Sequence, residues 1–221
     1  MERRFEGFVF DMDGLLIDSE RAVLRCWEQI GRENGLEGIT EFALSVIGQN
    51  SEETNRRFIA RYGEDLPVES FRQQTRDTFK AMLGNGQIDL KPYALEILKA
   101  LKAEGYKVAL ASSTSRHSVE DEMKVLGTYP YLDVLVCGDE VVNSKPDPEI
   151  FLKACSKLGL TPDKCCGFED SYNGIRSCKA AGLFTVMVPD ILPSTEETDR
   201  LADLIVADLG EAMKKLGIGI S

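Results

Sequence analysis

The chain has 221 residues, of which 43% are hydrophobic and 29% charged, a composition typical of a soluble globular protein with one elaborated domain or two small ones. Its net charge of −11 argues against nucleic acid or an anionic membrane as a partner, and no apolar run approaches the ~20 residues of a membrane span. The six cysteines form no C-x-x-C pair, so we expect reduced thiols in a cytoplasmic protein.

The first predicted element is a buried strand, Gly7–Phe10, which ends directly before two carboxylates, Asp11 and Asp13. In extended backbone, residues i and i+2 point the same way. Both acids therefore face one spot at the carboxyl end of the strand, where open α/β sheets bind ligands. Like charges repel, and burial makes them costlier. The segment predicts a site for a cation.

After Gly14 the apolar residues recur at helical spacing, and further amphipathic stretches follow from about Thr40 to Leu83. No convincing strand interrupts them, and Gly84–Gly86 marks a flexible return point. We therefore predict a small all-helical domain over residues 17–89, inserted into a core of residues 1–16 and 90–221.

From Pro92 onward, predicted helices alternate with predicted strands. The strands are Val108–Ala111, Val134–Val136, a segment leading into Phe168, Thr185–Val188 and Leu204–Val206. This alternation implies a parallel sheet with helices on both faces. The fold class is therefore α/β, with a Rossmann-like doubly wound core and a small helical domain.

Polar side chains follow the predicted strands at the points where the strands end. They are Asp11 with Asp13, Ser112 with Ser113 and Thr114, Lys145, and Glu169 with Asp170. In a doubly wound sheet, such ends lie along one edge and converge on one crevice. Carboxylates, one ammonium group and a hydroxyl-bearing turn suit phosphoryl transfer to an aspartate, with oxygen ligands for Mg²⁺.

Each of these groups also has a plain structural interpretation. Asp13 could be a turn residue before a glycine, and Ser112 could cap the following helix. Lys145 could be a solvated loop lysine, and Glu169 with Asp170 could complement a helix dipole. Their joint occurrence at strand ends favours the functional interpretation.

Four segments resemble the motifs of the haloacid dehalogenase-like superfamily, in the same order and over essentially the whole chain. They are Phe10–Gly14, Leu110–Ser112, Lys145–Pro146 and Gly167–Ser171. The helical insert after the first motif is similar to the cap of the subgroup that contains β-phosphoglucomutase and many small-molecule phosphatases.

The resemblance implies that Asp11 is the nucleophile, which forms an aspartyl-phosphate, and that Asp13 is the general acid and base. It also implies that Mg²⁺ is held by Asp11, Asp170 and the backbone carbonyl of Asp13, with Glu169 assisting directly or through water. A raised pKa would keep Asp13 protonated before the first step.

The resemblance further implies that Lys145 and Ser112 bind phosphoryl oxygens, with Ser113 beside them. Lys80 stands where the mutase keeps a phosphate-contacting lysine in its cap. Tyr93 stands where the family usually has glycine. The expected partner is a small phosphorylated metabolite, and a capped enzyme of this size can act as a monomer.

Residues of the predicted cap distinguish a hydrolase from a mutase. Val23 replaces the histidine of β-phosphoglucomutase, and the segment 48–52 offers Glu52 where the mutase has arginine. A mutase binds a second phosphate, so the loss of cationic groups favours a phosphatase, with sugar phosphates as the expected substrates. Lys80 points the other way and keeps a β-phosphoglucomutase-type mutase as the alternative.

Three other classes fit less well. A dehalogenase has no use for the metal ligands Asp13 and Asp170. A phosphonatase needs a Schiff-base lysine in the cap, for which Lys80 is a remote candidate. A non-enzymatic phosphoacceptor module of the receiver type shares the acidic strand end but has no reason for a helical insert.

Overall fold

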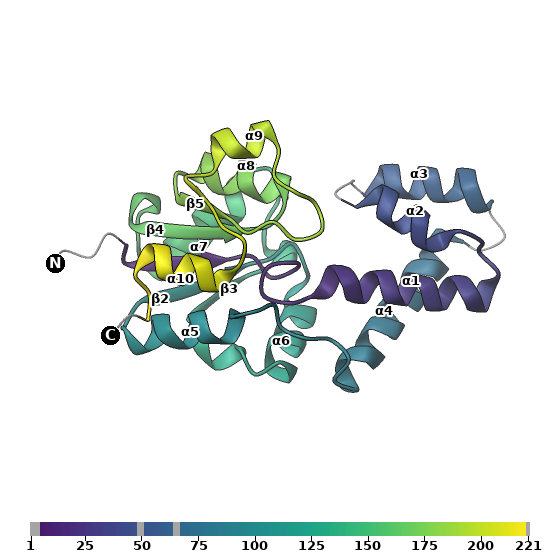
Figure 1. The fold of residues 1–221 in the computed structure, drawn as a ribbon, viewed down its shortest axis with the longest axis horizontal. Coiled ribbons are helices and arrows are strands. Elements are labelled where there is room, and N and C mark those ends of the chain that lie inside the picture. Colours follow the sequence, from purple (N-terminus) through teal and green to yellow (C-terminus); the bar gives the residue numbers. More distant parts are fainter. Residues whose placement is uncertain (1–4, 48–50, 64–66, 220–221) are drawn as a thin grey trace. The chain divides into compact units, whose positions relative to one another are not determined.

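A computed structural model of the protein describes residues 5–47, 51–63 and 67–219. The chain divides into two compact units, which Figure 1 shows by sequence colour. The sheet unit comprises Met1–Asp18 and Asp89–Ser221, and the helical unit comprises Ser19–Ile88. The chain therefore leaves the sheet unit after its first strand and returns to it once.

The sheet unit contains a six-stranded parallel sheet in the order β3-β2-β1-β4-β5-β6. The strands are β1 (Gly7–Phe10), β2 (Lys107–Ala111), β3 (Val134–Val136), β4 (Cys165–Glu169), β5 (Phe184–Met187) and β6 (Leu204–Ile205). The predicted doubly wound α/β fold is confirmed. Because β1 lies between β2 and β4, the strand order reverses at β1, which is where such sheets bind ligands.

Helices cover both faces of this sheet (Figure 1). They are α5 (Ala94–Ala103), α6 (Arg116–Val125), α7 (Glu149–Leu158), α8 (Tyr172–Ala181), α9 (Glu196–Leu201) and α10 (Leu209–Leu216), with short 3-10 helices η1 (Tyr129–Tyr131), η2 (Gly138–Glu140) and η3 (Pro162–Lys164). Helices α7 and α8 pack on one face around Val9 and Phe151. Phe10 and Phe168 stack with ring centroids 4.6 Å apart, so β1 and β4 are held side by side by their side chains as well as by their backbones.

The helical unit consists of α1 (Ser19–Asn34), α2 (Ile39–Val46), α3 (Ser51–Tyr62) and α4 (Val68–Gly84). Its core is aromatic: the Phe58 and Phe71 ring centroids are 4.7 Å apart, and those of Trp27 and Phe71 are 5.0 Å apart. Such pairs each contribute about 0.5–1.5 kcal/mol beyond the burial of apolar area. This unit therefore has a hydrophobic core of its own.

Tyr93 occupies a position at which the family that the sequence resembles usually has glycine. Its φ of 65° lies in the left-handed region that favours glycine. The ring lies against Gly210 of α10, where any Cβ would overlap it. A glycine in α10 thus gives space to the tyrosine ring that precedes α5.

None of the described helices is long and apolar enough to cross a membrane. All six cysteines are described, and all are buried as free thiols. They fill core positions, as reduced cysteines commonly do.

Candidate active site

Lys145 links the ends of three neighbouring strands. Its Nζ donates hydrogen bonds to Asp11 Oδ1 at 2.5 Å, to Glu169 Oε1 at 2.6 Å and to the Ala111 carbonyl at 2.9 Å. All three side chains are buried. Burial lowers the pKa of Lys145, but the charges of Asp11 and Glu169 outweigh it, so the net pKa is raised. One permanently charged ammonium group therefore faces two buried carboxyl groups.

Glu169 is held on its second oxygen by the chain that follows β4. Oε2 accepts hydrogen bonds from the amides of Asp170 and Ser171, both at 3.1 Å, and from the Ser171 hydroxyl at 3.0 Å. Ser171 also caps α8, because its Oγ accepts the Gly174 amide at 3.1 Å. Gly174 leaves the space that the Glu169 carboxylate fills, and a Cβ there would overlap it.

We therefore expect Gly174→Ala to push Glu169 away from Lys145. Activity should fall roughly 10²-fold, because a displacement of about 1 Å at a catalytic centre costs that much, and the overpacking should cost about 1–3 kcal/mol of stability. The matched control is Gly84→Ala, where the added Cβ meets nothing within 4 Å. Turnover assays and urea unfolding of both variants check this, and equal effects would show that Gly174 is not specially constrained.

The donor set fits a magnesium ion. Asp11, Glu169 and Asp170 each offer a carboxylate oxygen, and these atoms lie within 4.8 Å of one another. Burial raises the pKa of Asp11 to about 8, with Lys145 opposing the rise and Glu169 and Asp13 adding to it. Three carboxyl groups thus share one ammonium group, and ionisation of all three would leave an excess of negative charge. A hard divalent cation that prefers oxygen ligands would offset it.

Asp13 lies beside the turn that follows β2. Its Oδ2 accepts a hydrogen bond from the Thr114 hydroxyl at 2.9 Å, and the Ser112 hydroxyl accepts the Thr114 amide at 3.1 Å. Ser112 is fully buried, whereas Ser113 is exposed. The sequence indicated a hydroxyl-bearing turn but gave no signal that Thr114 would be the residue bonded to Asp13.

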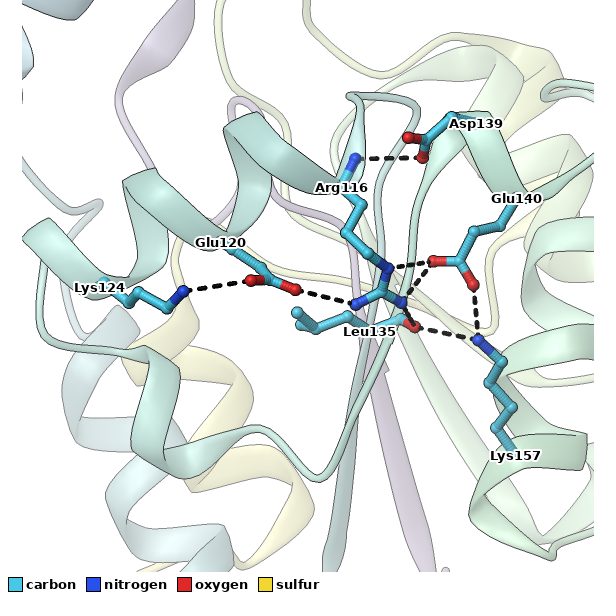
Figure 2. A network of polar contacts seen from close by, with 7 residues as sticks. All are labelled: Arg116, Glu120, Lys124, Leu135, Asp139, Glu140 and Lys157. Atoms are coloured by element: carbon cyan, nitrogen blue, oxygen red, sulfur yellow. Dashed lines mark hydrogen bonds and ion pairs between the residues drawn. The ribbon is translucent and has the colours of Figure 1, made fainter.

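An ion-pair network holds this turn in place (Figure 2). Arg116, the first residue of α6, donates to Glu140 of η2 through Nε at 2.9 Å and also through Nη2. Its other contacts are the Glu120 carboxylate at 3.2 Å and the Leu135 carbonyl at 2.9 Å. Lys157 donates to the second oxygen of Glu140 at 2.6 Å. The network ties α6, β3, η2 and α7 together two residues beyond Thr114.

The same network accounts for a second acidic cluster, formed by Cys137, Asp139 and Glu140. Glu140 is paired with Arg116 and Lys157, and Asp139 accepts the Arg116 amide at 3.1 Å. Two cations, Arg116 and Lys157, thus compensate Glu140, whereas at the ends of β1 and β4 the single ammonium group of Lys145 faces three carboxyl groups. The second acidic cluster is a structural cluster.

Glu122 of α6 is a buried carboxyl group close to this region that sequence reasoning missed. It is 8% exposed, and its Oε2 has no hydrogen-bond partner among the described residues. Burial raises its pKa from the ordinary 4.5 to about 8, and the charges of Asp13 and Asp121 add to the rise. Folded protein therefore keeps the proton on Glu122 at neutral pH.

The raised pKa of Glu122 predicts that this group lowers the stability of the folded protein as the pH rises, and that Glu122→Gln removes this effect. Between pH 4.5 and 8 the unfolded chain loses the proton while the folded chain keeps it, so the contribution of this group to stability falls as pH rises. The free energy of unfolding of the variant, relative to that of wild type, should increase by on the order of 2 kcal/mol between pH 4 and pH 8. Urea unfolding of metal-free protein measures it, with Glu96→Gln on the exposed face of α5 as control. A difference in free energy of unfolding that does not change with pH would contradict this prediction.

The helical unit contains the remaining predicted residues. Lys80 is exposed on α4. Val23 lines a mainly apolar cavity of about 170 Å³, together with Glu20, Leu24, Trp27, Ala43, Val46, Ile47 and Thr54. Residues 48–50 of the segment 48–52, which was compared above with the mutase, lie outside the described residues. The role of Lys80 stays a prediction.

Known proteins resemble this chain over most of its length. A family model described as "Haloacid dehalogenase-like hydrolase" matches residues 8–188. The chain is 33% identical over 211 residues to "Probable pseudouridine-5'-phosphatase" of Drosophila melanogaster, with 93% of this chain and 90% of the relative covered. It is 29% identical over 178 residues to "Phosphorylated carbohydrates phosphatase" of Thermotoga maritima, with 80% and 82% covered. A Thermotoga maritima crystal structure titled "putative beta-phosphoglucomutase" superimposes with a TM-score of 0.82 at 28% identity, covering 96% of this chain and 99% of that one.

Proposed function

The chain belongs to the haloacid dehalogenase-like hydrolase family, and from that premise we propose that it is a magnesium-dependent phosphatase of small phosphorylated metabolites, chiefly sugar phosphates. One observation carries the proposal: the buried Lys145 ammonium group contacts both Asp11 and Glu169, and oxygen atoms of these two side chains lie within 4.8 Å of one of Asp170. This arrangement offers a nucleophile, a phosphate-binding cation and oxygen ligands for a metal at one strand edge. Relatives named as phosphatases support the same activity.

Asp11 attacks phosphorus and forms an aspartyl-phosphate, which divides one difficult displacement into two easier ones. Mg²⁺, when held by Asp11, Asp170 and the Asp13 carbonyl with Glu169 assisting, would cancel the repulsion between the carboxylate and the phosphate. Lys145 holds a phosphoryl oxygen and orients Asp11 at the same time. The buried position of both residues keeps bulk water from screening these interactions.

Ser112 binds a second phosphoryl oxygen. Its Oγ already accepts the Thr114 amide, so its own proton is available to donate to an anion. Ser113 follows it on the exposed side of the turn and binds the substrate from there. The turn thus complements Lys145 around the phosphate.

Asp13 protonates the leaving oxygen and then removes a proton from the water that attacks the intermediate. The Thr114 hydroxyl, which donates to Asp13 Oδ2 at 2.9 Å, fixes that carboxyl and leaves Oδ1 for proton transfer. Residues 17–89 act as the cap that selects the leaving group, with Lys80 as a candidate contact to the substrate.

Asp13→Asn tests the acid–base role. The amide cannot transfer the proton, so kcat should fall roughly 10²- to 10⁴-fold. An activated ester such as p-nitrophenyl phosphate needs less help in the first step, so phosphoenzyme should accumulate with it. Thr114→Val is the companion variant, in which the carboxyl remains but loses its hydroxyl donor, and it should lose less activity. Unchanged turnover in Asp13→Asn would show that Asp13 does not carry the proton.

A β-phosphoglucomutase-type mutase is the second candidate, because Lys80 occupies the position of a phosphate-contacting lysine in that enzyme. Val23 weighs against it, since this residue lines a mainly apolar cavity at the position where the mutase has an imidazole. In a phosphatase, water is the final acceptor of the phosphoryl group, so the cap needs no second phosphate-binding site.

A screen of phosphorylated metabolites tests the proposal. Each compound is incubated with enzyme and Mg²⁺, and free phosphate is measured beside conversion of β-glucose 1-phosphate to glucose 6-phosphate with a bisphosphate primer. We expect phosphate release that chelation of Mg²⁺ abolishes. Efficient isomerisation without phosphate release would establish the mutase instead.

A further inference from the structure

A second ion pair, partly buried, lies next to the proposed metal ligands. Lys91 Nζ is 2.5 Å from Asp190 Oδ1, and the Asp190 side chain is 2% exposed. Lys91 also lies 3.9 Å from Asp18 Oδ1. Neither Lys91 nor Asp190 belongs to the four motifs, and neither has a role in the proposed mechanism.

Lys91 is fixed in position by its backbone. Its amide donates to the Leu16 carbonyl at 2.9 Å, and the preceding Leu90 pairs with Ile17. The Asp18 amide donates to the Asp89 carbonyl at 2.9 Å. The two crossings between the units thus run side by side within the sheet unit and hold the Lys91 side chain at Asp190.

Asp190 and Asp170 meet at Gly14. This glycine has φ +75°, and the nearest atoms to a Cβ built on it belong to the Asp170 carboxylate, followed by Asp190 Oδ2 at 3.4 Å. The Asp190 carboxylate therefore lies on the same side of the first-motif loop as a proposed metal ligand. The charge of Asp190 therefore acts on the proposed metal site, because the two lie much closer together than a Debye length.

We propose that Lys91 and Asp190 are a positioning pair that sets the affinity of the catalytic centre for its divalent cation. Lys91 cancels the charge of Asp190, so that Asp190 does not add a further negative charge beside Asp170. The inference rests on the proposed function, because it takes Asp170 as a metal ligand. It differs from a purely structural ion pair in that removing its two members has opposite effects.

Removal of the cation in Lys91→Met takes away the positive charge that offsets the Asp190 carboxylate and should tighten Mg²⁺ binding roughly three- to tenfold. Removal of the carboxylate in Asp190→Asn takes away the negative charge that offsets Lys91 and should weaken binding by a similar factor, roughly three- to tenfold. The double variant should return close to wild type, and Lys91→Arg, which keeps the charge, should bind like wild type.

Calorimetric titration of metal-free protein with MgCl₂ at pH 8 gives these dissociation constants without any turnover. Lys102→Met is the matched control, because Lys102 pairs with Asp133 at 2.6 Å and Asp133 lies at the opposite, amino end of β2. Urea unfolding shows which variants are folded. If Lys91→Met does not fold, Asp190→Asn compared with Lys91→Arg still tests the charge effect.

Opposite shifts in the two single variants support the pair as an electrostatic control of the metal. If both single variants bind Mg²⁺ more weakly than wild type, or both bind it as wild type does, the proposal is overturned and Lys91 and Asp190 form an ordinary ion pair. If wild-type protein itself takes up no Mg²⁺, the proposed metal site fails together with this inference, and that result is distinct from a wild-type site that the variants leave unshifted.

Discussion

Asp11→Asn is expected to abolish phosphatase activity while leaving the protein folded. The amide has the shape of the carboxylate but cannot attack phosphorus, so kcat/KM should fall about 10⁴-fold or more. The oxygen of the introduced amide would still accept a hydrogen bond from Lys145, which contacts Asp11 Oδ1 in wild type. The substitution also removes one of the mutually repelling carboxyl groups from the buried cluster, so stability should not decrease.

The measurement is phosphate release from p-nitrophenyl phosphate with saturating Mg²⁺, combined with urea unfolding. Asp121→Asn is the control, since that side chain is 45% exposed on α6 and faces His117. A loss in Asp11→Asn no larger than about tenfold would exclude a nucleophilic role, because truncation of a catalytic nucleophile costs far more.

Lys145→Met should impair both stability and activity. Without the ammonium group, Asp11 and Glu169 are left buried with no cation of the protein beside them, which should lower the free energy of unfolding by about 3–5 kcal/mol. Loss of the phosphate contact should lower kcat roughly 10²- to 10³-fold. Urea unfolding without metal and turnover with Mg²⁺ measure the two effects separately.

A second substitution separates the two effects of Lys145. Glu169→Leu in the Lys145→Met background removes one orphaned carboxylate, so part of the lost stability should return while activity stays low. Lys102→Met, which breaks a partly exposed ion pair with Asp133, should cost at most about 1 kcal/mol. If Lys145→Met costs no more than this control, Lys145 does not compensate the buried carboxylates.

Much of the sheet unit could be predicted from sequence, because its signals are local. The apolar run of Gly7–Phe10, the polar residues that follow each strand, and the alternation of strands with helices each depend on neighbouring residues. The parallel arrangement then brings Asp11 and Glu169 together, because strand ends of one sheet share an edge. Lys145 does not directly follow a strand as predicted: it lies in the loop between η2 and α7 and reaches the two carboxyl groups from there.

The contacts that sequence reasoning missed join distant segments of the chain. The Thr114 hydroxyl meets Asp13 across 101 positions, and Lys91 meets Asp190 across 99. Nothing local distinguishes Gly174 from other helical glycines until the Glu169 carboxylate is placed against it. The conformation of Tyr93 depends in the same way on Gly210. Side-chain packing in three dimensions, rather than periodicity, determines these positions.

Trapping the intermediate tests the central claim most directly. Enzyme turning over p-nitrophenyl phosphate with Mg²⁺ is quenched and treated with borohydride, which reduces an aspartyl-phosphate to homoserine, and the peptide around residue 11 is analysed by mass spectrometry. We predict homoserine at Asp11, and none when Mg²⁺ is chelated or in Asp11→Asn. Phosphate release with Asp11 unmodified, or modification at another carboxyl group, would contradict the account.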